Sequence, residues 1–381
     1  MAGLYIHIPF CKSRCTYCGF YSTTCLHRRQ AYIDALCREM VLRDKRREER
    51  GERREDTIQT IYLGGGTPSQ LTIPQLRQIF LYINKVYART ESLSPREVTI
   101  EMNPDDVTAE YAASLPLLGI NRVSMGAQTF DDSRLRFLNR RHNAAQVSQA
   151  VTTLRAAGIG NISIDLMYGF PGETLDAWQR DIDAALALDV EHISAYCLSL
   201  EPGTPLYEQV KNGNVEMGNE EAERQMYELL IDRLTAAGYE HYEISNFAQP
   251  GRRSRHNSSY WTDVPYIGLG AAAHSYDGRY RQWNVSDLDQ YIKGIASGTP
   301  DTERELIDEV TRFNDRVMLS LRTCEGLDIS RFSPSDREYL LRQAGKYIDN
   351  QLLRLTDDHL ILTRQGLFVS DMVMSDLMKE N

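Results

Sequence analysis

Short apolar runs rich in β-branched residues recur through the first half of the chain, and longer amphipathic stretches separate them. The apolar runs predict strands at 4–8, 57–63, 97–102, 122–125, 162–167 and 192–198. The stretches between them repeat their apolar positions every three or four residues, which predicts helices at 28–49, 74–87, 109–117, 144–157 and 175–188. Strands that alternate with helices are typical of parallel βαβ units. Six such units predict an α/β fold with a partial (β/α)6 TIM-like barrel, whose chemistry is expected in the loops at the carboxyl ends of the strands.

Beyond residue 210 the pattern changes. A long helix is expected at 220–237 and a short strand at 239–244, followed by a loop rich in Gly, Arg and Ser. Helices at 302–321 and 335–350 and a small sheet formed by 359–363 and 366–369 come next. This mixture predicts a compact C-terminal α+β domain that resembles a winged helix. We therefore divide the chain into a barrel at 1–210, a connecting region at 211–300 and a C-terminal domain at 301–381.

The composition limits the classes of protein that fit. A chain of 381 residues, 42% of them hydrophobic, is long enough for two domains and a large core. It has no apolar run long enough to cross a bilayer and no basic segment ahead of an apolar run at its start, so we expect neither a transmembrane segment nor a signal peptide. Peripheral contact with a membrane stays open. A net charge of −10 opposes nucleic-acid binding, and seven cysteines without an export signal indicate reduced thiols in the cytoplasm.

Three cysteines follow the first predicted strand directly. Cys11, Cys15 and Cys18 have C-x3-C-x2-C spacing, and thiolates are soft ligands that favour iron–sulfur clusters, zinc or copper(I). A structural zinc site normally has four protein ligands, often as two C-x2-C pairs, and this sequence has no second pair. An iron–sulfur cluster normally takes four cysteines, so three suggest a cluster with one iron open to an outside ligand. The alternative is three buried structural cysteines, which suits such a short polar loop poorly.

This spacing is the signature of the radical S-adenosylmethionine (SAM) superfamily. The stretch Tyr-Ile-His-Ile-Pro-Phe-Cys at 5–11 resembles the oxygen-independent coproporphyrinogen dehydrogenase family and, within it, the heme chaperone branch. The resemblance implies a barrel of the radical SAM type. It also implies a [4Fe–4S] cluster held by Cys11, Cys15 and Cys18, with SAM on the fourth iron.

Four further motifs of that family end successive predicted strands: Gly-Gly-Gly-Thr-Pro at 64–68, Glu-Met-Asn-Pro-Asp at 101–105, Ser-Met-Gly-Ala-Gln-Thr-Phe at 124–130, and Ser-Ile-Asp-Leu-Met-Tyr-Gly-Phe-Pro-Gly at 163–172. A fifth, Leu-Asn-Arg-Arg-His at 138–142, places Arg140 twelve residues after Gln128. Each is ordinary alone, because most Gly runs are turns and a lone carboxylate often caps a helix. Taken together, the motifs are implied by the resemblance to bind SAM. The residues implied are Tyr5, Tyr17, Gly65, Gly66, Thr67, Glu101, Gln128, Arg140 and Asp165.

The chemistry of these side chains suits that ligand. Glycines let a ligand approach the backbone closely, and the Glu101 carboxylate can accept hydrogen bonds from an amino group or a ribose. Arg140 can bind a carboxylate through its bidentate fork. Asp165 can hold both hydroxyls of a ribose.

Three features favour the chaperone branch over the dehydrogenases. The cluster loop ends Cys18-Gly19-Phe20, where the dehydrogenases have Cys-x-Cys, and only ten residues precede Cys11, where they have an N-terminal extension. The third feature is Arg-His-Asn-Ser-Ser-Tyr-Trp at 255–261, which resembles the heme motif His-Asn-Gln-x-Tyr-Trp, with Ser258 in place of Gln. Imidazole is a common axial ligand of heme iron, so the resemblance implies that His256 binds heme. Without the resemblance, this stretch would be interpreted as a basic surface loop with a capping histidine.

We therefore expect a heme chaperone that carries a [4Fe–4S] cluster and SAM, binds heme and transfers it to an unidentified acceptor protein. Coproporphyrinogen dehydrogenase activity is not expected. The alternative is a radical SAM oxidoreductase acting on a porphyrinogen, in which the reduced cluster cleaves SAM to a 5′-deoxyadenosyl radical. A winged-helix regulator that uses the cluster as a redox sensor fits poorly, since no basic recognition helix stands out in the C-terminal third.

Overall fold

The barrel half of the chain forms the predicted α/β alternation. The computed structural model describes residues 2–49, 58–88 and 95–380, so the predicted strand start at Thr57 lies outside the described residues. The strands are β1 (Ala2–Ile8), β2 (Ile58–Gly65), β3 (Glu97–Met102), β4 (Arg122–Gln128), β5 (Ile162–Tyr168) and β6 (His192–Cys197). The helices between them are α1 (Arg29–Glu49), α2 (Ile73–Tyr87), α3 (Ala109–Leu117), α4 (Asp132–Phe137), α5 (Ala144–Ala156) and α6 (Leu175–Ala187). Short 3₁₀ turns, η1 (Leu26–Arg28), η2 (Pro68–Gln70) and η3 (Pro104–Asp106), precede α1, α2 and α3.

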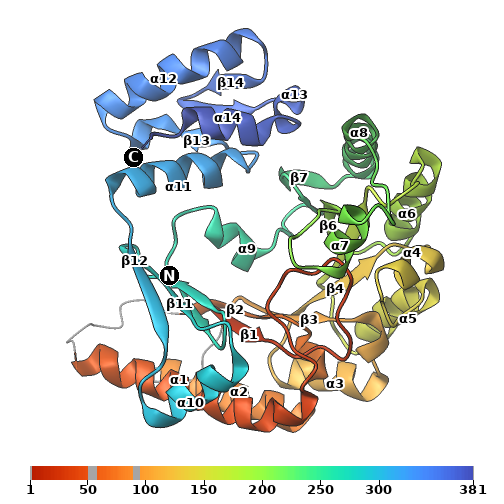
Figure 1. Ribbon diagram of the computed structural model, residues 1–381, viewed down its shortest axis with the longest axis vertical. Coiled ribbons are helices and arrows are strands. Elements are labelled where there is room, and N and C mark those ends of the chain that lie inside the picture. Colours follow the sequence, from red (N-terminus) through yellow and green to blue (C-terminus); the bar gives the residue numbers. More distant parts are fainter. Residues whose placement is uncertain (1, 50–57, 89–94, 381) are drawn as a thin grey trace.

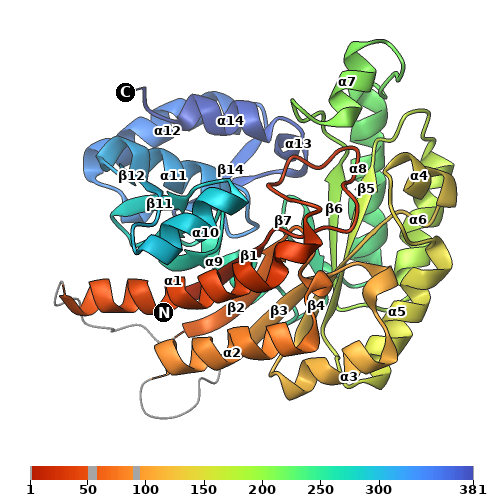
Figure 2. The same cartoon turned by 60° about the horizontal axis from the view of Figure 1, so that its bottom comes forward.

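The six strands pair in parallel and in sequence order, which confirms the predicted fold class. Their helices cover the outer face of the curved sheet (Figures 1 and 2). In β1 the side chains of Leu4, Ile6 and Ile8 are fully buried in the main hydrophobic core, whereas Tyr5 and His7 point to the opposite, inner face, because side chains alternate along a strand. Parallel pairing brings the carboxyl ends of all six strands to one rim of the sheet, where the predicted motifs lie.

The sheet continues beyond both edges of the barrel and has twelve strands in the described part of the chain. The added elements are α7 (Pro205–Lys211), α8 (Glu220–Ala236), β7 (Glu240–Glu243), β8 (Asn246–Ala248), α9 (Arg255–Tyr260), β9 (Tyr266–Leu269), β10 (His274–Tyr276), β11 (Tyr280–Asn284), α10 (Leu288–Ser297) and β12 (Thr302–Leu306). β8 pairs antiparallel to β6, with β7 beyond it, and β9 pairs parallel to β1, followed by β10, β11 and β12. The connecting region thus adds strands to both edges of the barrel sheet.

The C-terminal segment builds a separate α+β unit with its own core (Figure 1). It consists of α11 (Glu309–Leu321), β13 (Leu327–Asp328), a 3₁₀ turn η4 (Ile329–Arg331), α12 (Pro334–Asp349), β14 (Leu353–Thr356), β15 (His359–Leu362), α13 (Arg364–Leu367) and α14 (Ser370–Leu377). Its three strands form an antiparallel sheet in the order β13-β15-β14. Across the described residues, every helix is too short or too polar to span a bilayer.

Two predicted elements in this half are wrong. The helix expected at 302–321 begins only at Glu309, where Asp308 caps it by accepting a hydrogen bond from the Thr311 amide, and Thr302–Leu306 forms strand β12 instead. The strand expected at 366–369 belongs to helix α13 and the residues after it, and β15 pairs with β14. β12 forms because it pairs with β11, and β15 takes β14 as its partner in place of residues 366–369. In both cases packing overrides local preference.

Candidate functional site

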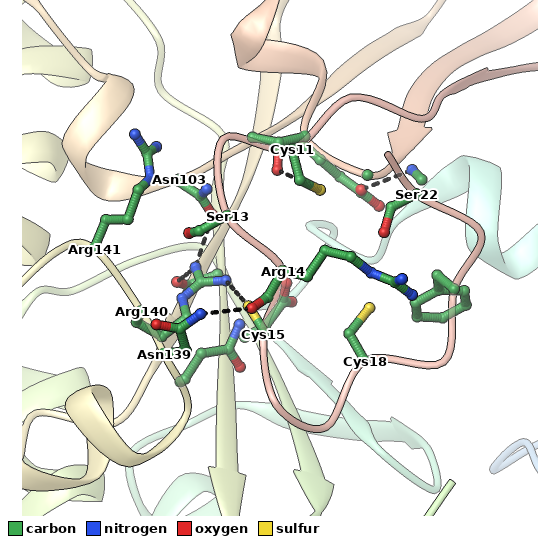
Figure 3. Close-up of a pocket in the computed structure, with 18 of the residues that line it drawn as sticks. Cys11, Ser13, Arg14, Cys15, Cys18, Ser22, Asn103, Asn139, Arg140 and Arg141 are labelled. Carbon is green, nitrogen blue, oxygen red and sulfur yellow. Dashed lines mark hydrogen bonds between the residues drawn. The ribbon is translucent and has the colours of Figure 1, made fainter. Parts of the chain in front are cut away.

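The cysteine loop leaves the carboxyl end of β1 and is closed at its base by two backbone hydrogen bonds. Cys11 N–H donates to Thr23 O at 2.9 Å, and Thr23 N–H donates to Pro9 O at 2.7 Å. The tip of the loop is held from the other side, since Thr16 N–H donates to Leu138 O at 3.1 Å. The loop therefore curves round the pocket at the rim of the barrel (Figure 3).

Cys11, Cys15 and Cys18 all line this pocket. The Cys11 thiol lies 3.4 Å from the hydroxyl of Thr67. Burial raises the pKa of the Cys11 and Cys18 thiols. Nowhere in the described chain do three His, Cys, Asp or Glu side chains converge on the position of a single metal ion. A cubane cluster binds its cysteines at separate iron corners, so three thiols spread round one pocket fit a cluster better than a single ion.

Gly65 and Gly66 form the wall of the pocket at the end of β2. Gly65 has φ +108°, and a Cβ there would lie 2.5 Å from the Cε1 atom of His7. A Cβ on Gly66 would lie 2.7 Å from the carbonyl carbon of Pro9. Neither position accepts a side chain, so the backbone itself faces the pocket, together with Thr67.

Glu101 and Asp165 supply the two carboxyl groups of the pocket. Glu101 accepts a hydrogen bond from the hydroxyl of Tyr62 at 2.8 Å and another from Gly65 N–H at 3.1 Å. Burial raises the pKa of Glu101 to about 7 and that of Asp165 to about 6. The pocket can therefore change its charge near neutral pH, which is a common property of functional sites.

Replacing Glu101 by Gln should make the stability of the cluster-free protein less dependent on pH. The folded pKa of Glu101 is raised from 4.5 to about 7, so its contribution to stability is present below pH 4.5 and is lost as the pH rises through 7. Between pH 5 and 8 the variant should therefore gain up to about 3 kcal/mol relative to wild type. Urea unfolding at both pH values measures this difference, with exposed Glu110→Gln as control. If the free energies of unfolding of the variant and the wild type differed by the same amount at pH 5 and at pH 8, Glu101 would be ionised throughout this range.

Arg140 reaches into the pocket from the segment after α4. Its Nη2 donates to Asn103 Oδ1 at 2.7 Å and to Gly126 O at 2.6 Å, and its Nη1 lies 3.5 Å from the sulfur of Cys15 (Figure 3). Gly126 leaves room for this approach, since a Cβ there would lie 2.9 Å from Nη2 of Arg140 and would displace the guanidinium. Asn103, which orients the guanidinium, was not predicted, although it stands inside the 101–105 motif.

Gln128 ends β4 with φ +67°, a conformation that is rare for a residue with a side chain. Such strain is found where a side chain must be aimed at a site, and Gln128 and Tyr17 both line the pocket. The structure thus brings together every residue predicted for the cluster and SAM except Tyr5. Tyr5 lies deeper, where its hydroxyl hydrogen bonds Nδ1 of His7 at 3.1 Å.

His256 lies apart from this pocket, in helix α9, and is 1% exposed. Its Nδ1 is 2.9 Å from the hydroxyl of Thr60, its Nε2 is 2.9 Å from the hydroxyl of Tyr260, and its ring stacks on Tyr62 at 5.1 Å. Burial lowers the pKa of His256 to about 3. Because both ring nitrogens are engaged, an iron atom would have to displace one of these partners. The observed packing therefore does not favour the predicted role of His256 as heme ligand.

The fold matches a solved structure over almost the whole chain. It is similar to coproporphyrinogen III oxidase (HemN) from Escherichia coli, a radical SAM enzyme, with a TM-score of 0.83, 21% identity, and coverage of 99% of this chain and 90% of that one. Residues 5–185 match the Radical SAM superfamily, and residues 307–369 match the HemN C-terminal domain. The fold and the three-cysteine pocket define a protein of the radical SAM class.

Sequence similarity to known proteins narrows the radical SAM class to one family. The chain is 37% identical to the heme chaperone HemW of Bacillus subtilis, with 87% of this chain and 86% of the relative covered. It is 33% identical to the heme chaperone HemW of Mycobacterium tuberculosis (99% and 94% covered). It is 31% identical to the mitochondrial radical S-adenosyl methionine domain-containing protein 1 of Bos taurus (99% and 87% covered). The chain belongs to the heme chaperone HemW family.

Proposed function

We propose that this protein is a heme chaperone that binds heme and delivers it to an acceptor hemoprotein, and that it carries a [4Fe–4S] cluster with SAM on the fourth iron. The observation that carries this proposal is the relation to the HemW family across nearly the whole chain. The three-cysteine pocket supports the cofactor part.

Different pocket residues bind different parts of the cluster and of SAM. Cys11, Cys15 and Cys18 hold three irons, and the cluster, when bound, supplies a fourth iron that binds an amino and a carboxylate group. Arg140 neutralises that carboxylate. Its guanidinium is already oriented by Asn103 and Gly126, at 2.7 and 2.6 Å, so little side-chain entropy is lost on binding.

The two carboxyl groups complete the SAM site. Glu101, fixed by Tyr62 and Gly65, accepts hydrogen bonds from SAM, and Asp165 holds the ribose hydroxyls. Gly65, Gly66 and Thr67 face the methionine part through their backbone, and Tyr17 and Gln128 close the remaining sides of the pocket.

Phe20 favours a chaperone over a dehydrogenase. It occupies the position at which the dehydrogenase loop has its further cysteine, and 71% of its surface is exposed next to the pocket. A phenylalanine there supplies no thiol. An exposed aromatic ring is suited instead to contact with a flat apolar molecule or a protein partner.

The proposal also assigns a role to each part of the chain and a cellular location to the protein. Residues 1–210 hold the cluster and SAM, residues 211–300 contribute to heme binding, and residues 301–381 form the C-terminal winged-helix-like domain. Free cysteines, seven in all, fit the reducing cytoplasm.

Reconstituted protein should bind a single heme per chain and should not convert coproporphyrinogen III to protoporphyrinogen IX when supplied with reductant and SAM. The physical reason is the missing thiol at Phe20. An anaerobic heme titration followed by Soret absorption, run beside a porphyrinogen conversion assay, measures both. Clear turnover of the porphyrinogen would instead support the radical SAM oxidoreductase, and absence of heme binding would remove the chaperone proposal.

A further inference from the structure

The proposed function requires a ligand for heme iron, and His256 is not free to provide one. The chain has eight histidines, all within the described residues. Six have at least one ring nitrogen in a hydrogen bond: His7, His142, His192, His241, His256 and His359. In the described part of the chain, only His27 and His274 are exposed with no hydrogen bond on either ring nitrogen.

His274 differs from His27 in having an aromatic partner that orients it. It opens strand β10, opposite Trp283 of β11 in the antiparallel register. The two rings stack with their centroids 5.6 Å apart and their planes 24° from parallel. Stacking of this kind restricts the rotation of the imidazole and leaves its ring nitrogens at the edge, where a metal can reach them.

The backbone of His274 crosses directly over Gly268 of β9. A Cβ at Gly268 would lie 1.9 Å from the carbonyl oxygen of His274, so only glycine permits this approach. β9 separates β10 from β1 in the sheet. Burial is the main cause that lowers the pKa of His7 to about 4, and His274 contributes to this lowering. His274 therefore lies in the extension of the sheet, two strands from β1.

The surroundings of His274 suit a flat, partly apolar ligand. Tyr276 follows it on the same face of β10, and its ring lies 6.4 Å from that of Tyr266 on β9. Arg281 stands opposite Tyr276 on β11, 34% exposed, and already bonds Asp315 of α11 at 2.8 Å. Partial burial of the ring and the nearby Arg281 lower the pKa of His274, which favours the neutral imidazole that binds metals.

We propose that His274 is the axial ligand of the heme iron, and that Trp283 holds its imidazole in the orientation for coordination. This inference rests on the proposed function and goes beyond it by moving the heme site from α9 to the β10–β11 face. Coordination is donation of the imidazole lone pair to iron, with no electron transfer.

The test is a titration of the full-length reconstituted protein with hemin and with dithionite-reduced heme. His274→Gln should weaken heme binding by about tenfold or more, since even loss of an outer-shell partner costs about that much at a metal site, and should shift the Soret band. The matched control is His27→Gln, the other exposed histidine, which should behave as wild type. His256→Gln should keep the wild-type Soret position.

A rescue experiment separates ligation from structural damage. Addition of imidazole to His274→Gly should restore the wild-type spectrum, which a merely misfolded variant would not show. Wild-type affinity and spectrum in His274→Gln would overturn His274 as ligand while leaving the chaperone proposal intact. A Soret shift in His256→Gln without one in His274→Gln would do the same. If the wild-type protein binds no heme, the proposed function fails and this inference fails with it.

Discussion

Replacement of Cys11, Cys15 or Cys18 by Ala is expected to abolish the iron–sulfur cluster in each single variant. The three thiols line one pocket. Loss of one thiolate leaves two protein ligands for four irons, too few to hold a cluster that normally takes four. Iron and sulfide analysis with visible absorption after anaerobic reconstitution measures the outcome.

Cys25→Ala is the matched control, since Cys25 is a free, exposed thiol in the same segment and does not line the pocket. It should retain the full iron content. A Cys15→Ala protein with wild-type iron, beside a Cys25→Ala protein that has lost it, would show that the ligands are misassigned.

Arg140→Lys should weaken SAM binding by about 1.5–3 kcal/mol, or roughly ten- to a hundredfold. The guanidinium bonds Asn103 and Gly126 through one nitrogen and approaches Cys15 through the other. A lysine ammonium cannot keep these contacts and bind a carboxylate through two parallel hydrogen bonds as well. The iron content should stay at the wild-type level, because the thiols are unchanged.

Equilibrium binding of SAM to the reconstituted protein measures this effect. Arg136→Lys serves as control, because Arg136 is exposed on the neighbouring helix α4 and does not line the pocket. Equal SAM affinity in Arg140→Lys and wild type would remove Arg140 from the proposed site.

The pocket could be predicted from the sequence because its residues follow a positional rule. Glu101 is the penultimate residue of β3 and Gln128 is the last of β4, and the ends of parallel strands meet at one rim. Tyr5 breaks the rule, since it lies three residues before the end of β1 and hydrogen bonds His7 below the pocket.

Long-range packing could not be predicted in the same way. Nothing local to His256 indicates that helix α9 packs against β2, where Thr60 and Tyr62 enclose the imidazole. Likewise, Thr302–Leu306 carries no signal for its partner β11, so its strand could not be told from a helix start. Pairing partners distant in sequence depend on the whole fold, whereas periodicity reports only local structure.

The central claim is that the protein hands heme to another protein. Heme-loaded protein, with cluster and SAM present, should be mixed with heme-depleted hemoproteins, and the rate at which each acceptor gains its Soret band should be compared with the rate of heme loss to excess apomyoglobin, a trap for free heme. A chaperone predicts that at least one acceptor fills faster than the trap and that the rate rises with acceptor concentration, because transfer passes through a complex. Filling of every acceptor at the trapping rate would mean passive release and would contradict the claim.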